Sequence, residues 1–282
     1  MDQPEPRHIF QVKRNIVAPP PVVVDVQRPD RTAAQAAEII PWRLGAAVLI
    51  GVWHGSHLPS KPAIRNNIES LSSLLHEGFG IPSPSIKVLE NPEYSEHVQR
   101  AVDVAMRSVD PVRGGFLLYY AGHGWTDSQT GQLLLSLPNS DPSKNFTALR
   151  FNSLREQIAD SNIPARLVIL DSCYSGAALD SLAGDIASST AIEGTYVMTS
   201  SSATNRSRAL DTDHYTTFTG ELINTLNHGI PNAPEILTAS VTYRYIRDIC
   251  NQRGWPEPLR SSRCEGENLP LMRNAWNQSE HE

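Results

Sequence analysis

The chain has 282 residues, of which 40% are hydrophobic and 19% are charged, so it can bury the core of one large domain or two small ones. Its formal net charge of -6 is not the basic balance of proteins that bind nucleic acid or anionic membranes, and we expect neither partner. No apolar run reaches the roughly 18 residues that a membrane span needs.

The first 42 residues differ from the rest of the chain. The consecutive prolines Pro19–Pro21 and the later Pro29 break any helix or central strand in this segment. We therefore expect a flexible, proline-rich N-terminal arm over 1–42, either a pro-segment or a tail. A single folded domain is expected over 43–282.

From Arg43 onward, short apolar runs alternate with segments of helical spacing. In chain order the pattern predicts a strand at 44–52, a helix at 62–77, a strand at 86–89, a helix at 94–109, a strand at 115–121, a small strand or hairpin arm at 132–137, a helix at 151–159, strands at 166–171 and 195–199, and helices near 215–228 and 239–252. This alternation favours an α/β fold, with a mostly parallel sheet covered by helices on both faces. In such a sheet the functional site lies outside the carboxyl ends of the strands.

Two of these strands lead into reactive residues. The third runs into YYAGHGW, which puts His123 just past the strand, and the fourth runs into ILDSCYSG, which puts Cys173 just past the strand. Both residues should lie at the same edge of the sheet. A cysteine nucleophile must lose its proton, and a nearby histidine can take that proton and return it to a leaving amine. Gly122 and Gly124 let the backbone approach a substrate, and the amides of Gly124 and Cys173 could stabilise an oxyanion.

Other interpretations of these residues stay open at this point. A strand-end cysteine is commonly a packed core residue, and a histidine after a strand is commonly a hydrogen-bonded loop residue. A zinc site is a further alternative, in which His54 and His57 would join His123 and Cys173. The odd count of three cysteines and the absence of an N-terminal apolar signal fit a reducing compartment, so a cytoplasmic location is expected. The two cysteines other than Cys173, which are Cys250 and Cys264, are expected to be small buried hydrophobic residues.

The histidine turn and the cysteine turn, 50 residues apart, resemble the caspase-type clan of cysteine peptidases, for which about 50 residues is the typical separation. The motifs YYAGHG and DSCYSG are similar to those of metacaspases and of short prokaryotic caspase-like proteins. The stretches VLIGVWHGSHLPSKPAIRNNIESLSSLL, HYTTFTGELINTL and LPLMRNAW are also similar to such proteins, so the resemblance covers about 43–276.

The resemblance implies a caspase-hemoglobinase fold with a six-stranded central sheet. It also implies that Cys173 is the nucleophile, His123 the acid and base, and the Gly124 amide an oxyanion donor. In metacaspases the acid that matches Asp171 lines the S1 pocket, and the family cuts after Arg or Lys. A carboxylate in the pocket would pair with a basic side chain and repel an acidic one. The alternative is that Asp171 only caps the turn after its strand.

The chain departs from metacaspases after the fifth strand, where further pocket acids are often found and where this chain has TSSSATNRSR. Asp211 or Asp213 would have to supply a second pocket charge. The segment 177–194, which many caspase-like proteins cut during maturation, contains no Lys or Arg. A basic-specific enzyme would therefore act as one piece or be cut elsewhere, in the N-terminal arm or in the loop that contains Arg206 and Arg208. The acids Asp127, Asp141, Asp211 and Asp213 lack the dense spacing of a calcium loop and are interpreted as solvated loop charges. No required metal or other cofactor is therefore expected.

The leading hypothesis is a cysteine endopeptidase that acts on proteins or peptides, with an upstream activating protein or protease, in a bacterial stress, death or defence pathway. The pathway is implied only by the resemblance. One alternative is a catalytically silent caspase-like module that binds through the same cleft. The other is a different cysteine hydrolase, such as a transpeptidase or an amidase.

Overall fold

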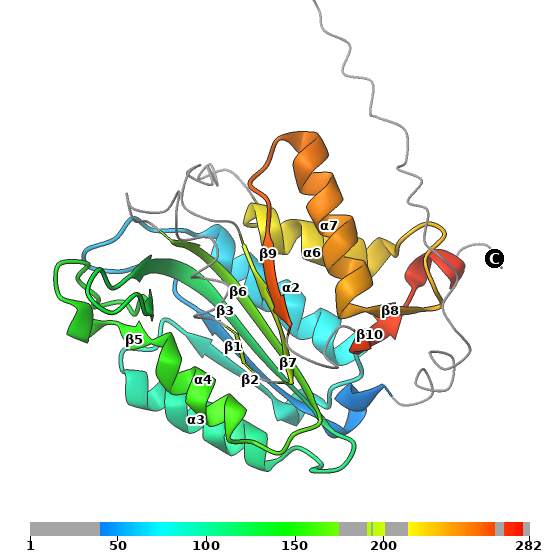
Figure 1. Ribbon diagram of the computed structural model, residues 1–282, viewed down its shortest axis with the longest axis horizontal. Coiled ribbons are helices and arrows are strands. Elements are labelled where there is room, and N and C mark those ends of the chain that lie inside the picture. Colours follow the sequence, from blue (N-terminus) through cyan, green and yellow to red (C-terminus); the bar gives the residue numbers. More distant parts are fainter. Residues whose placement is uncertain (1–39, 175–190, 193, 201–213, 263–267, 279–282) are drawn as a thin grey trace, which may run out of the picture.

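The computed structural model describes residues 40–174, 191–192, 194–200, 214–262 and 268–278 (Figure 1). The helices and strands in these ranges are η1 (Pro41–Leu44), β1 (Ala46–Gly51), α2 (Ala63–Glu77), η2 (Ser83–Ser85), β2 (Ile86–Glu90), α3 (Ser95–Arg107), β3 (Gly115–Thr126), β4 (Leu133–Leu135), η3 (Asn145–Thr147), β5 (Leu149–Arg150), α4 (Phe151–Ala159), β6 (Ala165–Tyr174), β7 (Thr195–Thr199), α6 (Thr217–His228), β8 (Ile236–Thr238), α7 (Ala239–Arg253), β9 (Leu259–Ser262), β10 (Pro270–Arg273) and η6 (Ala275–Gln278).

A twisted sheet forms the centre of the fold, with the strand order β2-β1-β3-β6-β7-β9 in the described part of the chain. The first five strands pair in parallel, and β9 joins antiparallel at the edge next to β7. Two short strands, β4 and β5, extend the sheet off β3, and β8 pairs with β10 in a separate ribbon. The mostly parallel, six-stranded path agrees with the sequence prediction.

Helices cover both faces of the sheet, and each face has its own apolar core (Figure 1). Alternate residues of β3 show the division: Leu117 and Tyr119 pack with α2, α6 and α7, whereas Phe116 and Leu118 pack with α3 and α4. The central strands are buried on both faces, which is why their sequences are continuous apolar runs instead of alternating ones. Both faces are therefore closed, and the exposed part of the sheet is its edges and strand ends.

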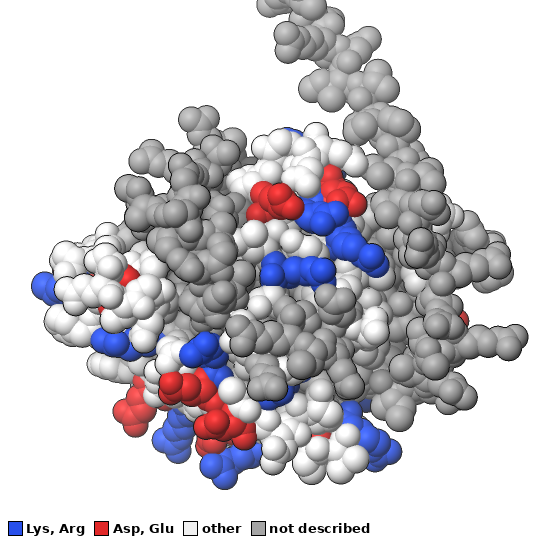
Figure 2. Space-filling model, viewed as in Figure 1, with Lys and Arg blue, Asp and Glu red and all other residues white. Residues whose placement is uncertain are grey.

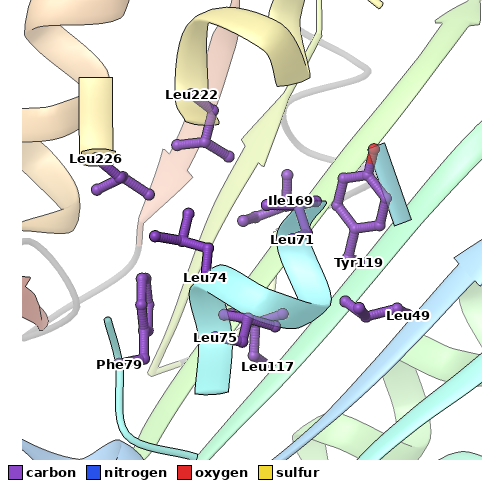
Figure 3. Close-up of a pocket in the computed structure, with 10 residues that line it drawn as sticks. All are labelled: Leu49, Leu71, Leu74, Leu75, Phe79, Leu117, Tyr119, Ile169, Leu222 and Leu226. Atoms are coloured by element: carbon purple, nitrogen blue, oxygen red, sulfur yellow. The ribbon is translucent and has the colours of Figure 1, made fainter. Parts of the chain in front are cut away.

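Side chains of α2 and α6 meet the sheet around a small apolar cavity (Figure 3). Ten residues line it, and all are apolar except for one tyrosine: Leu49, Leu71, Leu74, Leu75, Phe79, Leu117, Tyr119, Ile169, Leu222 and Leu226. The Tyr119 hydroxyl points away from the leucine side chains in this view. The lining offers no polar group apart from Tyr119 to hold a water molecule or a polar ligand, so we interpret the cavity as a packing gap in the apolar core.

The structure extends two of the predicted strands past the reactive residues. β3 continues from the predicted end at Ala121 to Thr126, and β6 continues from Asp171 to Tyr174. The expectation that His123 and Cys173 lie just past the strands was therefore wrong, because both residues are inside them. The extra length of β3 has a physical cause, since the hairpin partner β4 supplies backbone hydrogen-bonding groups beside 124–126.

Pro41 and Trp42, at the end of the predicted N-terminal arm, belong to η1 in the structure. Trp42 is fully buried in the core, and its indole Nε1–H donates to the Pro270 carbonyl at 2.9 Å. Cys250 on α7 is buried with 2% of its surface exposed, which agrees with its interpretation as a small core residue. Cys264 lies outside the described residues.

Acidic and basic side chains are interspersed on the face of the molecule in Figure 2, over the part of that face that the structure describes. They do not gather there into a large area of one sign. In the described ranges, the helices are all too short or too polar to cross a membrane.

Candidate functional site

His123 and Cys173 are direct neighbours across two parallel strands. The register pairs the Cα atoms of Tyr119 and Ile169, Ala121 and Asp171, and then His123 and Cys173. The sequence predicted only that the two residues share an edge of the sheet, and the register shows that their backbones lie side by side. The Cys173 side chain lies outside the described part of the structure.

The ring of His123 is oriented by a backbone carbonyl. Nε2 lies 2.8 Å from the carbonyl oxygen of Pro59, in the connection between β1 and α2. A carbonyl only accepts hydrogen bonds, so Nε2 carries the proton in the neutral ring, and the lone pair is on Nδ1. Nδ1 is therefore the atom of His123 that can accept a proton from a neighbouring group.

The surroundings of His123 favour this neutral form. Burial of the ring lowers the pKa of His123, and the positive charge of Lys61 lowers it further. The hydrogen bond to Pro59 acts in the opposite direction and raises the pKa. The net effect is a pKa below the ordinary histidine value, so Nδ1 keeps its lone pair to a lower pH than in an exposed histidine.

We predict that replacing Lys61 by glutamine raises the pKa of His123. The lysine charge disfavours the protonated ring, so without it the ring gains its proton at a higher pH. The titration can be followed by NMR from the imidazole chemical shifts of His123 between acid and neutral pH. Lys87→Gln, at an exposed position on β2, is the matched control. An unchanged or lowered pKa of His123 in Lys61→Gln would contradict the assignment of this charge effect.

The two glycines beside His123 have different structural roles. A Cβ on Gly122 would lie 2.3 Å from the Tyr120 hydroxyl, which occupies that space and lies 2.9 Å from the His123 carbonyl oxygen. Gly122 is therefore required by the packing of Tyr120 under the strand, a reason that the sequence did not indicate.

Gly124 lies where its backbone groups face the cysteine strand. Ser136 of the hairpin donates its N–H to the His123 carbonyl, and Ala121 accepts from Val52 on the β1 side. Because N–H and C=O groups alternate in direction along a strand, those of Gly124 face β6. Gly124 pairs with Tyr174 in this ladder, so its backbone lies directly beside the strand that carries Cys173.

Asp171 is half-buried on β6 and is held by the first turn of α6. Its Oδ2 atom accepts hydrogen bonds from the hydroxyls of Thr216, in a very short contact, and of Thr219 at 2.5 Å. Within the described residues, no hydrogen bond is made to the other oxygen, Oδ1. In the described part of the chain, the hydrogen-bond partners of Asp171 lie 45 and 48 residues away at the start of α6, whereas the turn that Asp171 would cap in the alternative interpretation lies outside the described residues.

The residues that orient His123 and Asp171 were not predicted from the sequence. They are Pro59 and Lys61 beside His123, and Asn67, Thr216 and Thr219 beside Asp171. A carbonyl that orients a ring leaves no signal in the sequence, because every residue has one. The two threonines do have a signal, since HYTTFTGELINTL belongs to the stretches on which the resemblance rests.

The residues of the weaker alternatives are not brought together where the structure describes them. His54 and His57 are exposed, and among the described side chains no three His, Cys, Asp or Glu residues are close enough to hold a metal ion. Asp127 was predicted to be solvated and is instead buried, with a carboxylate that accepts from the Gln129 amide at 2.9 Å. Asp141 forms a similar local turn with Ser143. The segment 177–190, Arg206, Arg208, Asp211 and Asp213 lie outside the described residues.

The chain was compared with family models, with solved structures and with curated proteins. The family model described as caspase domain matches residues 44–253. A solved structure of caspase-1 from Spodoptera frugiperda is similar with a TM-score of 0.54 and 14% identity, over 77% of this chain and 86% of that chain. At this identity the likeness concerns the fold alone, and it confirms the expected caspase-type fold. A comparison with curated proteins gives no match.

Proposed function

Because the chain belongs to the caspase-domain family of cysteine peptidases, we propose that it is an active endopeptidase with Cys173 as nucleophile and His123 as acid and base. The observation that carries the proposal is the register of β3 and β6, in which the Cα atoms of these two residues are partners. The Pro59 carbonyl supports it, since it leaves the Nδ1 lone pair of His123 available for a proton.

The proposed reaction begins when the thiol proton of Cys173 passes to Nδ1 of His123. The sulfur then attacks the carbonyl carbon of the scissile peptide, and the oxygen becomes an oxyanion that the amides of Gly124 and Cys173 stabilise. The imidazolium gives its proton to the leaving amine as the C–N bond breaks, which leaves an acyl group on the sulfur. Water then attacks this thioester and gives one proton to Nδ1. The C–S bond breaks to release the carboxylic acid, and the imidazolium returns its proton to the sulfur, which restores the thiol.

The proposed substrate class is a protein or peptide with Arg or Lys at P1, and Asp171 supplies the charge that recognises it. The carboxylate is two residues before the nucleophile on the same strand, and its Oδ1 atom accepts no hydrogen bond from a described residue. A carboxylate in a pocket favours a basic side chain and repels an acidic one. An upstream activating partner and a role in stress, death or defence stay predictions.

We predict that the purified chain cleaves peptides with Arg or Lys at P1 and leaves the matched Asp peptide uncut. The physical reason is charge complementarity with Asp171, which the acidic peptide reverses. The measurement is kcat/KM for a series of fluorogenic peptides that differ only at P1. A series in which the Asp peptide is cleaved fastest would contradict the proposed specificity, whereas the dyad would stand.

A further inference from the structure

A buried hydrogen-bond network connects Asp171 with α2, β3 and the first turn of α6. Asn67 of α2 is fully buried, and its side-chain NH₂ lies 3.1 Å from the Tyr119 hydroxyl and 2.6 Å from the Thr216 hydroxyl. The Tyr119 hydroxyl lies 2.8 Å from that of Thr219, and both threonine hydroxyls reach Oδ2 of Asp171. The Tyr119 ring lines the apolar cavity, with its hydroxyl directed away from the leucines (Figure 3).

Counting protons fixes the direction of every bond in this network. An ionised carboxylate only accepts, so Thr216 and Thr219 each donate their single hydroxyl proton to Asp171. Thr219 must then accept from Tyr119, which keeps its proton because burial and the charge of Asp171 raise the pKa of its hydroxyl. Tyr119 and Thr216 in turn accept the two amide protons of Asn67.

Asn67 uses its oxygen and its nitrogen in this network. Its Oδ1 atom accepts the backbone N–H of Thr216 at 3.2 Å, so its oxygen and both its amide protons are in use. Thr216 is the N-cap residue of α6, yet its hydroxyl makes no capping bond to the helix. That hydroxyl is directed at Asp171, so its contribution is to the carboxylate and not to the start of the helix.

The consequence is that one oxygen of Asp171 is fully occupied by the protein. A carboxylate oxygen offers about two acceptor sites, and at Oδ2 both are filled by threonine hydroxyls. Resting on the proposed role of Asp171 in binding P1, we propose that Thr216 and Thr219 are positioning residues that restrict recognition to Oδ1. A basic P1 side chain would then be held by a single oxygen.

Recognition by a single oxygen changes what the pocket can distinguish. Arginine gains its advantage over lysine on a carboxylate from two parallel hydrogen bonds, one to each oxygen. When Oδ2 accepts nothing more, the guanidinium and the ammonium each make one charge-assisted bond. The chain should therefore bind Arg and Lys with similar affinity and should still reject an uncharged side chain of the same shape.

Binding to the Cys173→Ala protein tests this inference without depending on turnover. Three peptides that differ only at P1, with Arg, Lys or citrulline, are titrated by calorimetry. The Kd values for Arg and Lys should lie within about threefold of each other, and citrulline should bind about tenfold more weakly or worse, as expected for the loss of a charged hydrogen-bond partner.

Two isosteric variants free one acceptor site on Oδ2, namely Thr219→Val and Thr216→Val in the same Cys173→Ala background. In each, the guanidinium can reach both oxygens, so the preference for Arg over Lys should rise by about three- to tenfold. Thr219→Ser and Thr216→Ser keep the hydroxyls and should leave the ratio unchanged. Circular dichroism selects the variants that fold, and either valine variant alone suffices.

The outcomes separate this inference from the proposed function. A valine variant that weakens Arg and Lys binding equally would mean that the threonines only support the fold, and it would overturn the inference. A parent protein that prefers Arg over Lys by a hundredfold would overturn it too. Equal binding of the Arg and citrulline peptides would mean that Asp171 does not recognise P1, and it would overturn the inference. Peptide turnover by the unmutated chain tests the Cys173–His123 dyad independently.

Discussion

Replacement of Cys173 by alanine is expected to lower kcat/KM for a P1 arginine peptide by about a thousandfold or more, the order of loss seen when a covalent nucleophile is removed. The register of β3 and β6 makes Cys173 the backbone neighbour of His123, and in the proposed reaction no other group can form the acyl intermediate. The second measurement is labelling by an arginyl chloromethyl ketone, detected by mass spectrometry. The unmutated chain should gain one inhibitor adduct, and Cys173→Ala should gain none.

Cys250→Ala provides the control for Cys173→Ala. The Cys250 thiol is 2% exposed in the α7 core, and burial raises its pKa to about 11, so it remains protonated and is a poor nucleophile near neutral pH. This variant should keep both turnover and labelling. If the unmutated chain forms no adduct under any activating condition, the catalytically silent binding module becomes the better hypothesis. If the Cys173→Ala protein still forms an adduct, the nucleophile is a different residue.

Replacement of Asp171 by asparagine is expected to reduce kcat/KM for the P1 arginine peptide by about ten- to a hundredfold, the range that a charge-assisted hydrogen bond supplies. The asparagine oxygen can still accept from the hydroxyls of Thr216 and Thr219, so the first turn of α6 keeps its attachment. The matched citrulline peptide should change little, because it carries no charge for Asp171 to recognise. The measurement is the ratio of kcat/KM for the two peptides.

The control for Asp171→Asn is Asp248→Asn, which removes a partly exposed acid of α7 that pairs with Arg247. It should leave the ratio of the two peptides unchanged. If Asp171→Asn lowers cleavage of the arginine and citrulline peptides by the same factor, then Asp171 only anchors α6. That result would contradict the proposed S1 role and would leave the Cys173–His123 dyad intact.

Most of the central sheet could be predicted because its strands are continuous apolar runs separated by helical patterns. β1, β3, β6 and β7 each carry such a run, and the helices between them repeat apolar residues at helical spacing. The short strands β8, β9 and β10 were not predicted. They have three or four residues each and pair with distant partners, so the pairing and not the local pattern determines them.

The ends of the two site strands show why local patterns are insufficient. Glycines flank His123, and polar residues flank Cys173, so the sequence indicated turns at both places. In the structure β3 and β6 continue past these residues. The hairpin strand β4 pairs with the end of β3, and β3 itself pairs with the end of β6. Backbone partners from elsewhere in the chain therefore override weak local strand propensity.

The sequence by itself indicated which residues to consider for the candidate site. His123 and Cys173 come after continuous apolar runs and Asp171 ends one of them, and parallel strands bring such ends to one edge of the sheet. Only the tertiary structure decided how these residues are held. The Pro59 carbonyl that orients His123 is 64 residues away, and Asn67 meets the Thr216 hydroxyl across 149 residues. Such contacts arise when helices pack onto a sheet, and a sequence pattern is local, so it cannot specify which atoms will meet.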